Sequence, residues 1–235
     1  MPRISTIAFD ADDTLWQNEQ FFRLTAQRFA DLLRDYTDSP DLADRLVAAT
    51  ARNLRFYGFG AKGFSLSMVE TALEVTDHRV PGTVIAEILA AGRELLDFPL
   101  ETLPHVDAAL NRLQHTHRLI LITKGDLFDQ ERKLAASGLA DYFAAVEVVS
   151  DKTEPVYRRL FDRHTEGPAR TIMVGNSLKS DILPALAAGA FAAYVPHDLT
   201  WSYEHADEPV GHARYTRIEH LGQLQSAIDG FDAQA

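Results

Sequence analysis

The hydrophobic positions near the start of the chain form a short continuous run. This run, Ile4 to Phe9, contains only apolar residues and two small hydroxyl residues, which is typical of a buried strand. The carboxylates of Asp10, Asp12 and Asp13 follow it directly. Since side chains of an extended segment alternate between two faces, Asp10 and Asp12 can point the same way. Two carboxylates on one side repel each other, so the pattern predicts a divalent cation beside them, with a plain acidic turn as the alternative.

The apolar positions of the next segment recur every three or four residues, which is the period of a helix. This spacing predicts helices over residues 21–33, 42–54, 66–75 and 84–96. Three glycines between Tyr57 and Phe64 predict a loop there. We expect this loop to influence substrate choice, with Lys62 reaching a second anionic group of the substrate. The favoured alternative is a plain helix–helix connection with a solvated Lys62.

The second half of the chain alternates between apolar runs and helical spacing. It predicts strands over 118–123, 145–149, 171–174 and 191–195, and helices over 106–114, 128–137, 155–164 and 182–188. The remaining residues predict a polar loop over 197–212, a short strand near Tyr215 and a helix over 218–228. His197 and Trp201, just beyond the fifth strand, either approach the edge of a site or belong to a surface loop.

This alternation predicts an α/β fold, with a three-layer, Rossmann-like parallel sheet and right-handed crossovers. The helical block interrupts the pattern after the first strand. We therefore expect a core domain formed by residues 1–16 and 98–235, with residues 17–97 inserted as an all-helical cap domain. A chain of 235 residues is long enough for one such core and its insertion.

Polar side chains follow each of the first four predicted strands. They are Asp10 and Asp12, then Thr123 and Lys124, then Lys152, and finally Asn176 and Asp181. Parallel strands bring their carboxyl ends to one edge of a sheet, where ligands of such folds bind. Taken singly, these residues have ordinary explanations, such as helix caps for Thr123 and Asp181 or a solvated surface position for Lys152. What indicates a site is that all of them follow the ends of predicted strands, at one edge of the sheet.

This set of groups suits phosphoryl transfer, in which catalysis consists of positioning and charge stabilisation. We predict that Asp10 attacks phosphorus and that Asp12 protonates the leaving oxygen and then deprotonates water. Thr123 and Lys152 would hold phosphoryl oxygens. Lys124 either binds substrate or faces water.

A hard cation such as Mg²⁺ suits the oxygen groups at this edge. We predict that it is bound by Asp10, Asp181 and the backbone carbonyl near Asp12. Asp13 is predicted to have a structural role in the turn after the first strand.

The four clusters resemble the motifs of the haloacid dehalogenase (HAD) superfamily. The first motif, an apolar strand followed by Asp-x-Asp-x-Thr-Leu, is matched by the residues from Phe9 to Leu15. Thr123 matches the second motif, and Lys152 followed by Pro155 matches the third. The fourth is matched by Gly175-Asn176-Ser177 with Asp181 downstream. The resemblance implies the strand order 5-4-1-2-3 and a mobile helical cap inserted after the first motif.

The resemblance also implies a Mg²⁺-dependent phosphatase, because phosphatases of the superfamily have the second aspartate, here Asp12, which its 2-haloacid dehalogenases lack. Asn176 departs from the usual Gly-Asp of the fourth motif and removes one negative charge, so weaker Mg²⁺ binding is expected. As a neutral amide, it is predicted to contribute to substrate binding. The alternatives are a phosphomutase or a 2-haloacid dehalogenase of the same superfamily, or a non-catalytic binding protein on the same scaffold.

The composition narrows the range of partners. A net charge of −11 argues against nucleic acid and anionic membrane surfaces, and the lack of cysteine excludes disulfides and thiolate chemistry. No apolar run is long enough to span a bilayer, and Met1 to Ile4 lead into a strand rather than into the apolar core of a signal peptide. We expect a cytoplasmic monomer or homodimer that acts on a small phosphorylated metabolite.

Overall fold

The structure, a computed structural model, describes residues 4–233 and divides the chain into two compact units. One unit comprises Met1–Gln17, Leu100–Lys124 and Gln130–Ala235 and contains the sheet. The other comprises Asn18–Pro99 and Gly125–Asp129 and is helical. The predicted core and cap domains stay predictions, and residues 125–129, which the prediction assigned to the core, belong to the helical unit.

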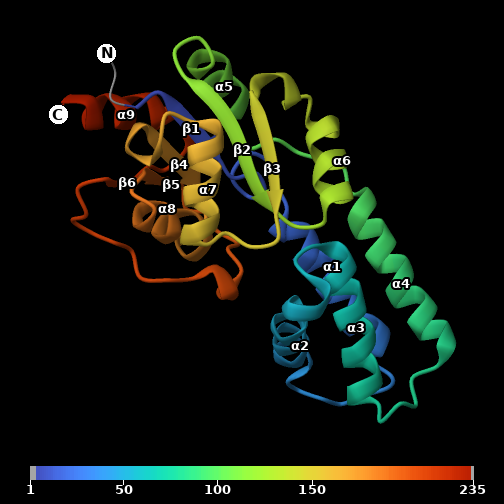
Figure 1. Ribbon diagram of the computed structural model, residues 1–235. Helices are drawn as coiled ribbons and strands as arrows, with labels where there is room; N and C mark the ends of the chain where they lie inside the picture. Colours follow the sequence, from blue (N-terminus) through green and yellow to red (C-terminus); the bar gives the residue numbers. More distant parts are fainter. Residues whose placement is uncertain (1–3, 234–235) are drawn as a thin grey trace. The chain divides into compact units, whose positions relative to one another are not determined.

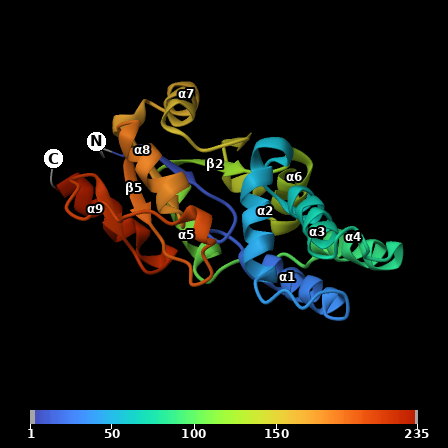
Figure 2. The ribbon, with the colours of Figure 1, turned by 90° about the horizontal axis from the view of Figure 1, so that it is seen from below.

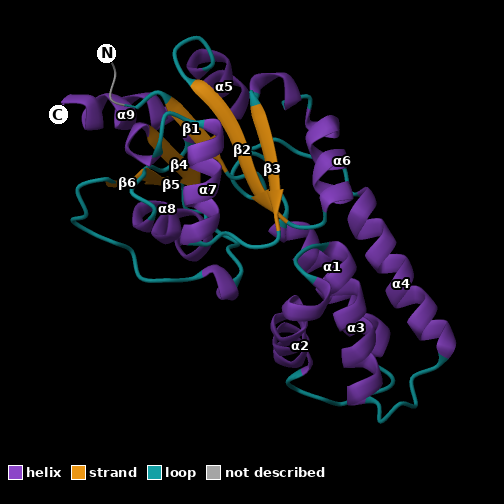
Figure 3. Ribbon diagram, viewed as in Figure 1, coloured by secondary structure: helices purple, strands orange, loops and turns teal. Residues whose placement is uncertain are grey.

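A parallel sheet forms the centre of the first unit (Figures 1 and 3). Its strands are β1 (Thr6–Phe9), β2 (Arg118–Lys124), β3 (Ala145–Val149), β4 (Thr171–Gly175), β5 (Phe191–Tyr194) and β6 (Tyr215–Arg217). Among the described residues their order is β3-β2-β1-β4-β5-β6, with every neighbouring pair parallel. This confirms the predicted α/β fold and the order 5-4-1-2-3, with the short strand near Tyr215 added beside β5.

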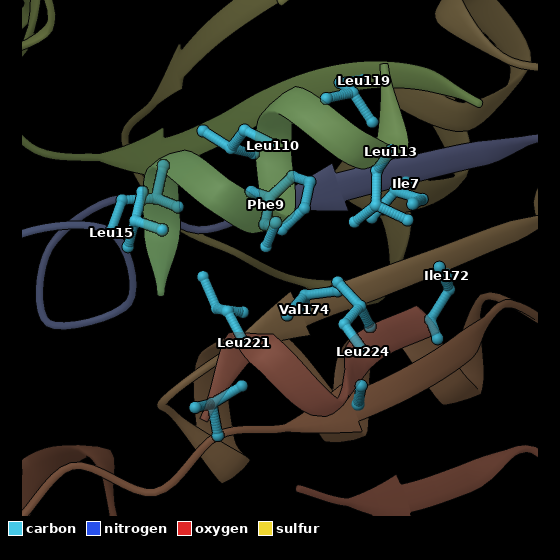
Figure 4. Close-up of a cluster of buried hydrophobic side chains, with 14 of the residues drawn as sticks. Ile7, Phe9, Leu15, Leu110, Leu113, Leu119, Ile172, Val174, Leu221 and Leu224 are labelled. Carbon is cyan, nitrogen blue, oxygen red and sulfur yellow. The ribbon is translucent and has the colours of Figure 1, made fainter. Parts of the chain in front are cut away.

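Both faces of the sheet are covered by helices, which explains why its strands are almost continuously apolar. Side chains alternate along β1, so Ile7 and Phe9 enter one apolar cluster while Ala8 enters another. Figure 4 shows the first cluster, in which Phe9 lies with Leu110 and Val174. The β1 strand therefore lies at the centre of the core, which holds the backbone of the next residue, Asp10, in place.

The helices of this unit contribute side chains to these two clusters. Figure 2 shows helices on both sides of the sheet. On the face of Phe9 lie α5 (Val106–Leu113), α6 (Leu127–Ser137) and α9 (Leu224–Ala233). On the face of Ala8 lie α7 (Glu154–His164) and α8 (Leu183–Ala187). Short connecting turns complete the unit: η1 (Ala140–Tyr142), η2 (Pro168–Arg170), η4 (Ser202–Glu204), η5 (Leu221–Gln223) and the π-helical η3 (Leu178–Ile182).

The second unit has its own apolar core, centred on Phe29, Met68 and Ile88. Its helices are α1 (Glu19–Leu33), α2 (Leu42–Tyr57), α3 (Ala61–Val75) and α4 (Gly82–Asp97). Amphipathic helices of this kind are stable only when their apolar faces pack together. None of the described helices has a stretch long and apolar enough to cross a bilayer.

The predicted loop between Tyr57 and Phe64 is too long, because α3 begins at Ala61 rather than at Leu66. Gly60 precedes this helix with φ at +110°, a conformation that favours glycine. Lys62 therefore lies in the first turn of a helix, where its Nζ donates to Asp126 Oδ1 at 2.8 Å. Its side chain is about half exposed, and a role in substrate choice stays a prediction.

The last predicted helix is also misplaced, since α9 begins at Leu224 rather than at Ile218. The backbone N–H of Ile218 donates to the carbonyl of Tyr194 at 2.9 Å, so Ile218 continues the strand pairing instead. His220 is extended, with φ at −159° and ψ at 162°, and only then does the chain turn into η5 and α9. Strand pairing has overridden the helical spacing here.

The contact between α3 and α4 predicts a different cost for two alanine substitutions. A Cβ added at Gly92 would lie 2.1 Å from Ser65 Oγ and 2.8 Å from Ser65 Cβ, so we expect Gly92→Ala to lower the free energy of unfolding by about 1–3 kcal/mol. Gly230 in α9 has open space around it, and Gly230→Ala should be neutral or raise stability by about 0.5 kcal/mol. Urea unfolding of both variants checks this, and a Gly92→Ala protein as stable as the wild type would contradict it.

Candidate active site

Three of the predicted site residues meet at the carboxyl edge of the sheet. Asp10 directly follows β1, Lys152 lies just beyond β3, and Asp181 lies in the η3 turn after β4. The Lys152 ammonium group donates to Asp10 Oδ1 and, at 2.7 Å, to Asp181 Oδ1. All three side chains are buried. The structure thus brings together residues that are 142 and 29 positions apart in the chain.

The two carboxylates carry more negative charge than one lysine neutralises. Burial and the neighbouring Asp181 raise the pKa of Asp10 to about 7, although Lys152 works in the opposite direction. Burial alone would lower the pKa of Lys152, but the attraction of Asp10 and Asp181 outweighs it, so that pKa is raised. The site therefore favours a lysine that stays charged beside an Asp10 that resists ionisation, and added positive charge would stabilise it.

Thr14 connects the first motif to the turn after β4. Its Oγ1 donates to Asp10 Oδ2 at 3.0 Å and accepts from the backbone N–H of Asn176 at 3.1 Å. The Asn176 amide oxygen lies 3.4 Å from the same hydroxyl. Asn176 is therefore placed beside Asp10, as its position in the sequence predicts.

Gly175 makes room for Asp181. A Cβ at position 175 would lie 2.2 Å from Asp181 Oδ2, so any larger residue would displace this carboxylate. The same oxygen accepts from the backbone N–H of Ser177 at 3.0 Å. Beneath the turn, the buried Tyr157 hydroxyl donates to the carbonyl of Ser180 at 3.1 Å. These contacts fix the direction in which Asp181 points.

Asp12 has a different set of neighbours. Its Oδ1 accepts from Trp16 Nε1 at 2.7 Å and from Lys133 Nζ at 2.6 Å, and its Oδ2 accepts from Gln130 Nε2 at 3.2 Å. Gln130 also donates to the buried Thr123 hydroxyl, which lies at the end of β2. Asp12 and Thr123 are thus linked through one side chain.

Lys124, a predicted substrate-binding residue, is hydrogen-bonded to the η3 turn and to Glu204. Its Nζ donates to Ser180 Oγ at 2.7 Å and to the Glu204 carboxylate. His197, whose position the sequence left open, lies with its Nδ1 3.8 Å from Asp13 Oδ1, next to the first motif. Trp201 stacks on Tyr203 at 4.9 Å between ring centroids.

Sequence reasoning missed three residues of this region: Gln130, Lys133 and Glu204. Gln130 and Lys133 are three positions apart on α6 and so share one face of a helix that directly follows the Thr123 strand, which is a usable signal. Glu204 lies in a polar loop with several other acidic residues, and no periodicity marks it. Only the folded chain shows that it is buried.

The oxygen groups of this edge fit a hard divalent cation. Asp10 and Asp181 are two buried carboxylates with excess negative charge, and the Asn176 amide lies beside them. Among the described residues no group of three or more His, Cys, Asp or Glu side chains is arranged to hold a metal ion. Mg²⁺ needs no such group, because it is commonly bound by one or two carboxylates together with water and substrate phosphate.

Comparison with known proteins places this geometry in context. The model of a family described as haloacid dehalogenase-like hydrolase matches residues 4–189. The crystal structure of a haloacid dehalogenase-like family hydrolase from Xanthomonas campestris is 35% identical, with a TM-score of 0.89 over 100% of this chain and 98% of that chain.

Two kinds of curated protein are more distant relatives. N-acylneuraminate-9-phosphatase from Rattus norvegicus is 29% identical over 129 residues, which is 53% of this chain and 52% of that protein. The match thus spans about half the length of that relative. Pyrimidine 5'-nucleotidase YjjG from Escherichia coli (strain K12) is 25% identical over 232 residues, which is 94% of this chain and 96% of that protein.

The raised pKa of Asp10 predicts that its charge destabilises the metal-free protein. The unfolded chain releases this proton near pH 3.8, whereas the folded chain keeps it up to about pH 7, so stability present below pH 3.8 is lost as the pH rises to about 7. Asp10→Asn removes the ionisation. As the pH rises from about 4 to about 8, we expect the stability of the variant to increase relative to that of the wild type. The increase should be a few kcal/mol at most, since one pKa unit is worth about 1.4 kcal/mol.

Urea unfolding in EDTA at both pH values measures this gain. The exposed Asp141→Asn serves as the matched control, because it removes the same charge from the surface. A difference between Asp10→Asn and the wild type that does not change with pH would contradict the assignment.

Proposed function

The chain belongs to the haloacid dehalogenase-like hydrolase family, and from this premise we propose that it is a Mg²⁺-dependent phosphomonoester hydrolase acting on a small phosphorylated metabolite. The observation that carries the proposal is the buried Asp10 carboxylate, which has the Lys152 ammonium on one oxygen and the Thr14 hydroxyl on the other. A carboxylate held in this way at a strand end is oriented for attack on an electrophile. Lys152 reduces its repulsion toward an incoming phosphate dianion.

In the first step, an Asp10 oxygen attacks phosphorus. The bond between phosphorus and the ester oxygen breaks, and Asp12 gives its proton to the departing alcohol. The product is an aspartyl-phosphate on Asp10. Lys152 and the Thr123 hydroxyl hold the phosphoryl oxygens, whose charge is spread over three positions in the transition state. Lys124 and Asn176 provide a further ammonium group and an amide at the same edge.

In the second step, Asp12 takes a proton from water, the oxygen of that water attacks phosphorus, and Asp10 is released together with inorganic phosphate. Asp12 is held by Trp16, Gln130 and Lys133, which orient its carboxyl group. Asp10 and Asp181, with the backbone at Asp12, would hold Mg²⁺. When bound, Mg²⁺ supplies a Lewis acid that polarises the phosphoryl oxygens.

The relatives suggest which metabolites to test. One relative is named for an acylneuraminate 9-phosphate and another for pyrimidine 5'-nucleotides, so sugar phosphates and nucleotides are the first classes we propose. The helical unit is proposed to act as the cap that selects among them. Asp12 disfavours a 2-haloacid dehalogenase, because dehalogenation has no leaving alcohol that needs a proton.

Phosphate release tests the proposal directly. The wild-type protein should release inorganic phosphate from p-nitrophenyl phosphate and from some members of a panel of sugar phosphates and nucleotides, with Mg²⁺ but not with EDTA. Asp10→Asn should lower turnover at least about a thousand-fold, because the nucleophile is lost while the shape is kept. Asp141→Asn should leave turnover unchanged.

Two outcomes would oppose this proposal. Substantial turnover by Asp10→Asn would remove Asp10 as the nucleophile. Binding of phosphate without release of phosphate from any ester would indicate a binding protein on the same scaffold.

The position of Asn176 predicts the effect of restoring a charge. Asn176→Asp adds a carboxylate beside Thr14 and Asp10, and we expect it to tighten Mg²⁺ binding by about ten-fold, because affinity for hard cations rises with the number of charged ligands. Isothermal titration with Mg²⁺ measures this. Asn111→Asp on the exposed face of α5 adds the same charge at a distance and is the control. Unchanged or weaker binding by Asn176→Asp would be evidence against a cation site at this position.

A further inference from the structure

Glu204 is a buried carboxylate on a polar loop. It ends the short η4 turn in the connection between β5 and β6, and only 9% of its surface is exposed, whereas its neighbours Ser202 and His205 are exposed. Burying a carboxylate is costly unless it is paired and hydrogen-bonded. Its position therefore depends on the groups that it meets.

Three donors surround this carboxylate. Ser177 Oγ donates to Glu204 Oε2 at 2.6 Å, and Ser180 Oγ donates to the same oxygen. The Lys124 ammonium donates to Oε1. Burial alone would raise the pKa of Glu204, but Lys124 and the two hydroxyl groups outweigh it and lower that pKa, so the carboxylate is charged at neutral pH.

The two serines belong to the turn that carries Asp181. The backbone N–H of Ser177 donates to Asp181 Oδ2 at 3.0 Å, and the backbone N–H of Ser180 donates to Ser177 Oγ at 2.9 Å. One residue, Ser177, thus connects the Glu204 carboxylate to the Asp181 carboxylate. The turn is π-helical, a form that is rare and often found at functional sites.

The charges of this region form two groups. Asp10, Asp181 and Lys152 make one, and Glu204 with Lys124 makes the other. Lys124 comes from the end of β2 and also donates to Ser180, so the second group joins the β2 end to the η3 turn. Without Glu204, the Lys124 ammonium would lose its ion-pair partner and keep its hydrogen bond to Ser180.

We infer that Glu204 is a positioning residue for Asp181. It holds the η3 turn through Ser177 and Ser180, and it fixes Lys124 at the end of β2. The inference deepens the proposed function. Its test by Mg²⁺ binding rests on that function, whereas its test by hydrogen exchange does not. Residues that orient metal ligands typically change metal affinity 10- to 100-fold when they are altered.

The first measurement is amide hydrogen exchange in the metal-free protein. In Glu204→Gln the N–H of Ser177 should exchange at least about ten-fold faster than in the wild type, while amides of β4 such as Ile172 keep their protection. Glu208→Gln is the matched control, because Glu208 lies on the same loop and pairs with Arg217 at 2.9 Å. Equal protection of Ser177 in Glu204→Gln and the wild type would overturn the inference.

The second measurement is Mg²⁺ titration by calorimetry. We expect Glu204→Gln to bind Mg²⁺ about 10-fold more weakly and Glu208→Gln to bind it as the wild type does. The double variant Lys124→Met/Glu204→Gln should recover part of the affinity, because it also removes the ammonium charge that Glu204 neutralises in the wild type.

The two readouts separate the hypotheses. Weakened Mg²⁺ binding in Glu208→Gln equal to that in Glu204→Gln would show a general loop effect and overturn the inference. A wild-type protein without Mg²⁺ binding would contradict the proposed function, and the exchange of the Ser177 amide would still decide the role of Glu204.

Discussion

The site depends on one ammonium group shared by two buried carboxylates. Lys152 contacts both Asp10 and Asp181, and neither acid has enough water around it to be stable alone. Removing the ammonium would leave two buried carboxylates without compensation, and loss of one partner of a buried ion pair typically costs about 3–5 kcal/mol. The three residues therefore constrain one another, and the segments that carry them must keep their relative positions.

The sheet satisfies this constraint through its topology. The strand β1 lies between β2 and β4, so Asp10 is placed at the centre of the carboxyl edge. The apolar clusters on both faces hold β1 rigidly, since Ile7 and Phe9 pack on one side and Ala8 on the other. A rigid strand lets a carboxylate be presented in one orientation, which nucleophilic attack requires.

Around this centre the chain places supporting groups that come from outside the strand ends. Gln130 and Lys133 on α6 hold Asp12, and Glu204 on a loop holds the turn of Asp181. Each of them adds a hydrogen bond to a polar group of the site. These hydrogen bonds thus hold the motif residues in defined positions. The same arrangement pairs Lys124 with Glu204.

The amino-acid sequence by itself determined the fold class and the polar groups at the strand ends, because apolar runs and their spacing are local properties of the chain. The strand order followed only from the resemblance of its motifs to the HAD superfamily. The sequence placed the start of α3 and of α9 wrongly. The positive φ of Gly60, directly before α3, is visible only in the structure, and the pairing of Ile218 with Tyr194 is a tertiary effect. The burial of Glu204 had no local signal at all. Only the folded chain decides which distant donors meet a given carboxylate, because such contacts join residues far apart in sequence, as Lys124 and Glu204 are, and their energies depend on burial.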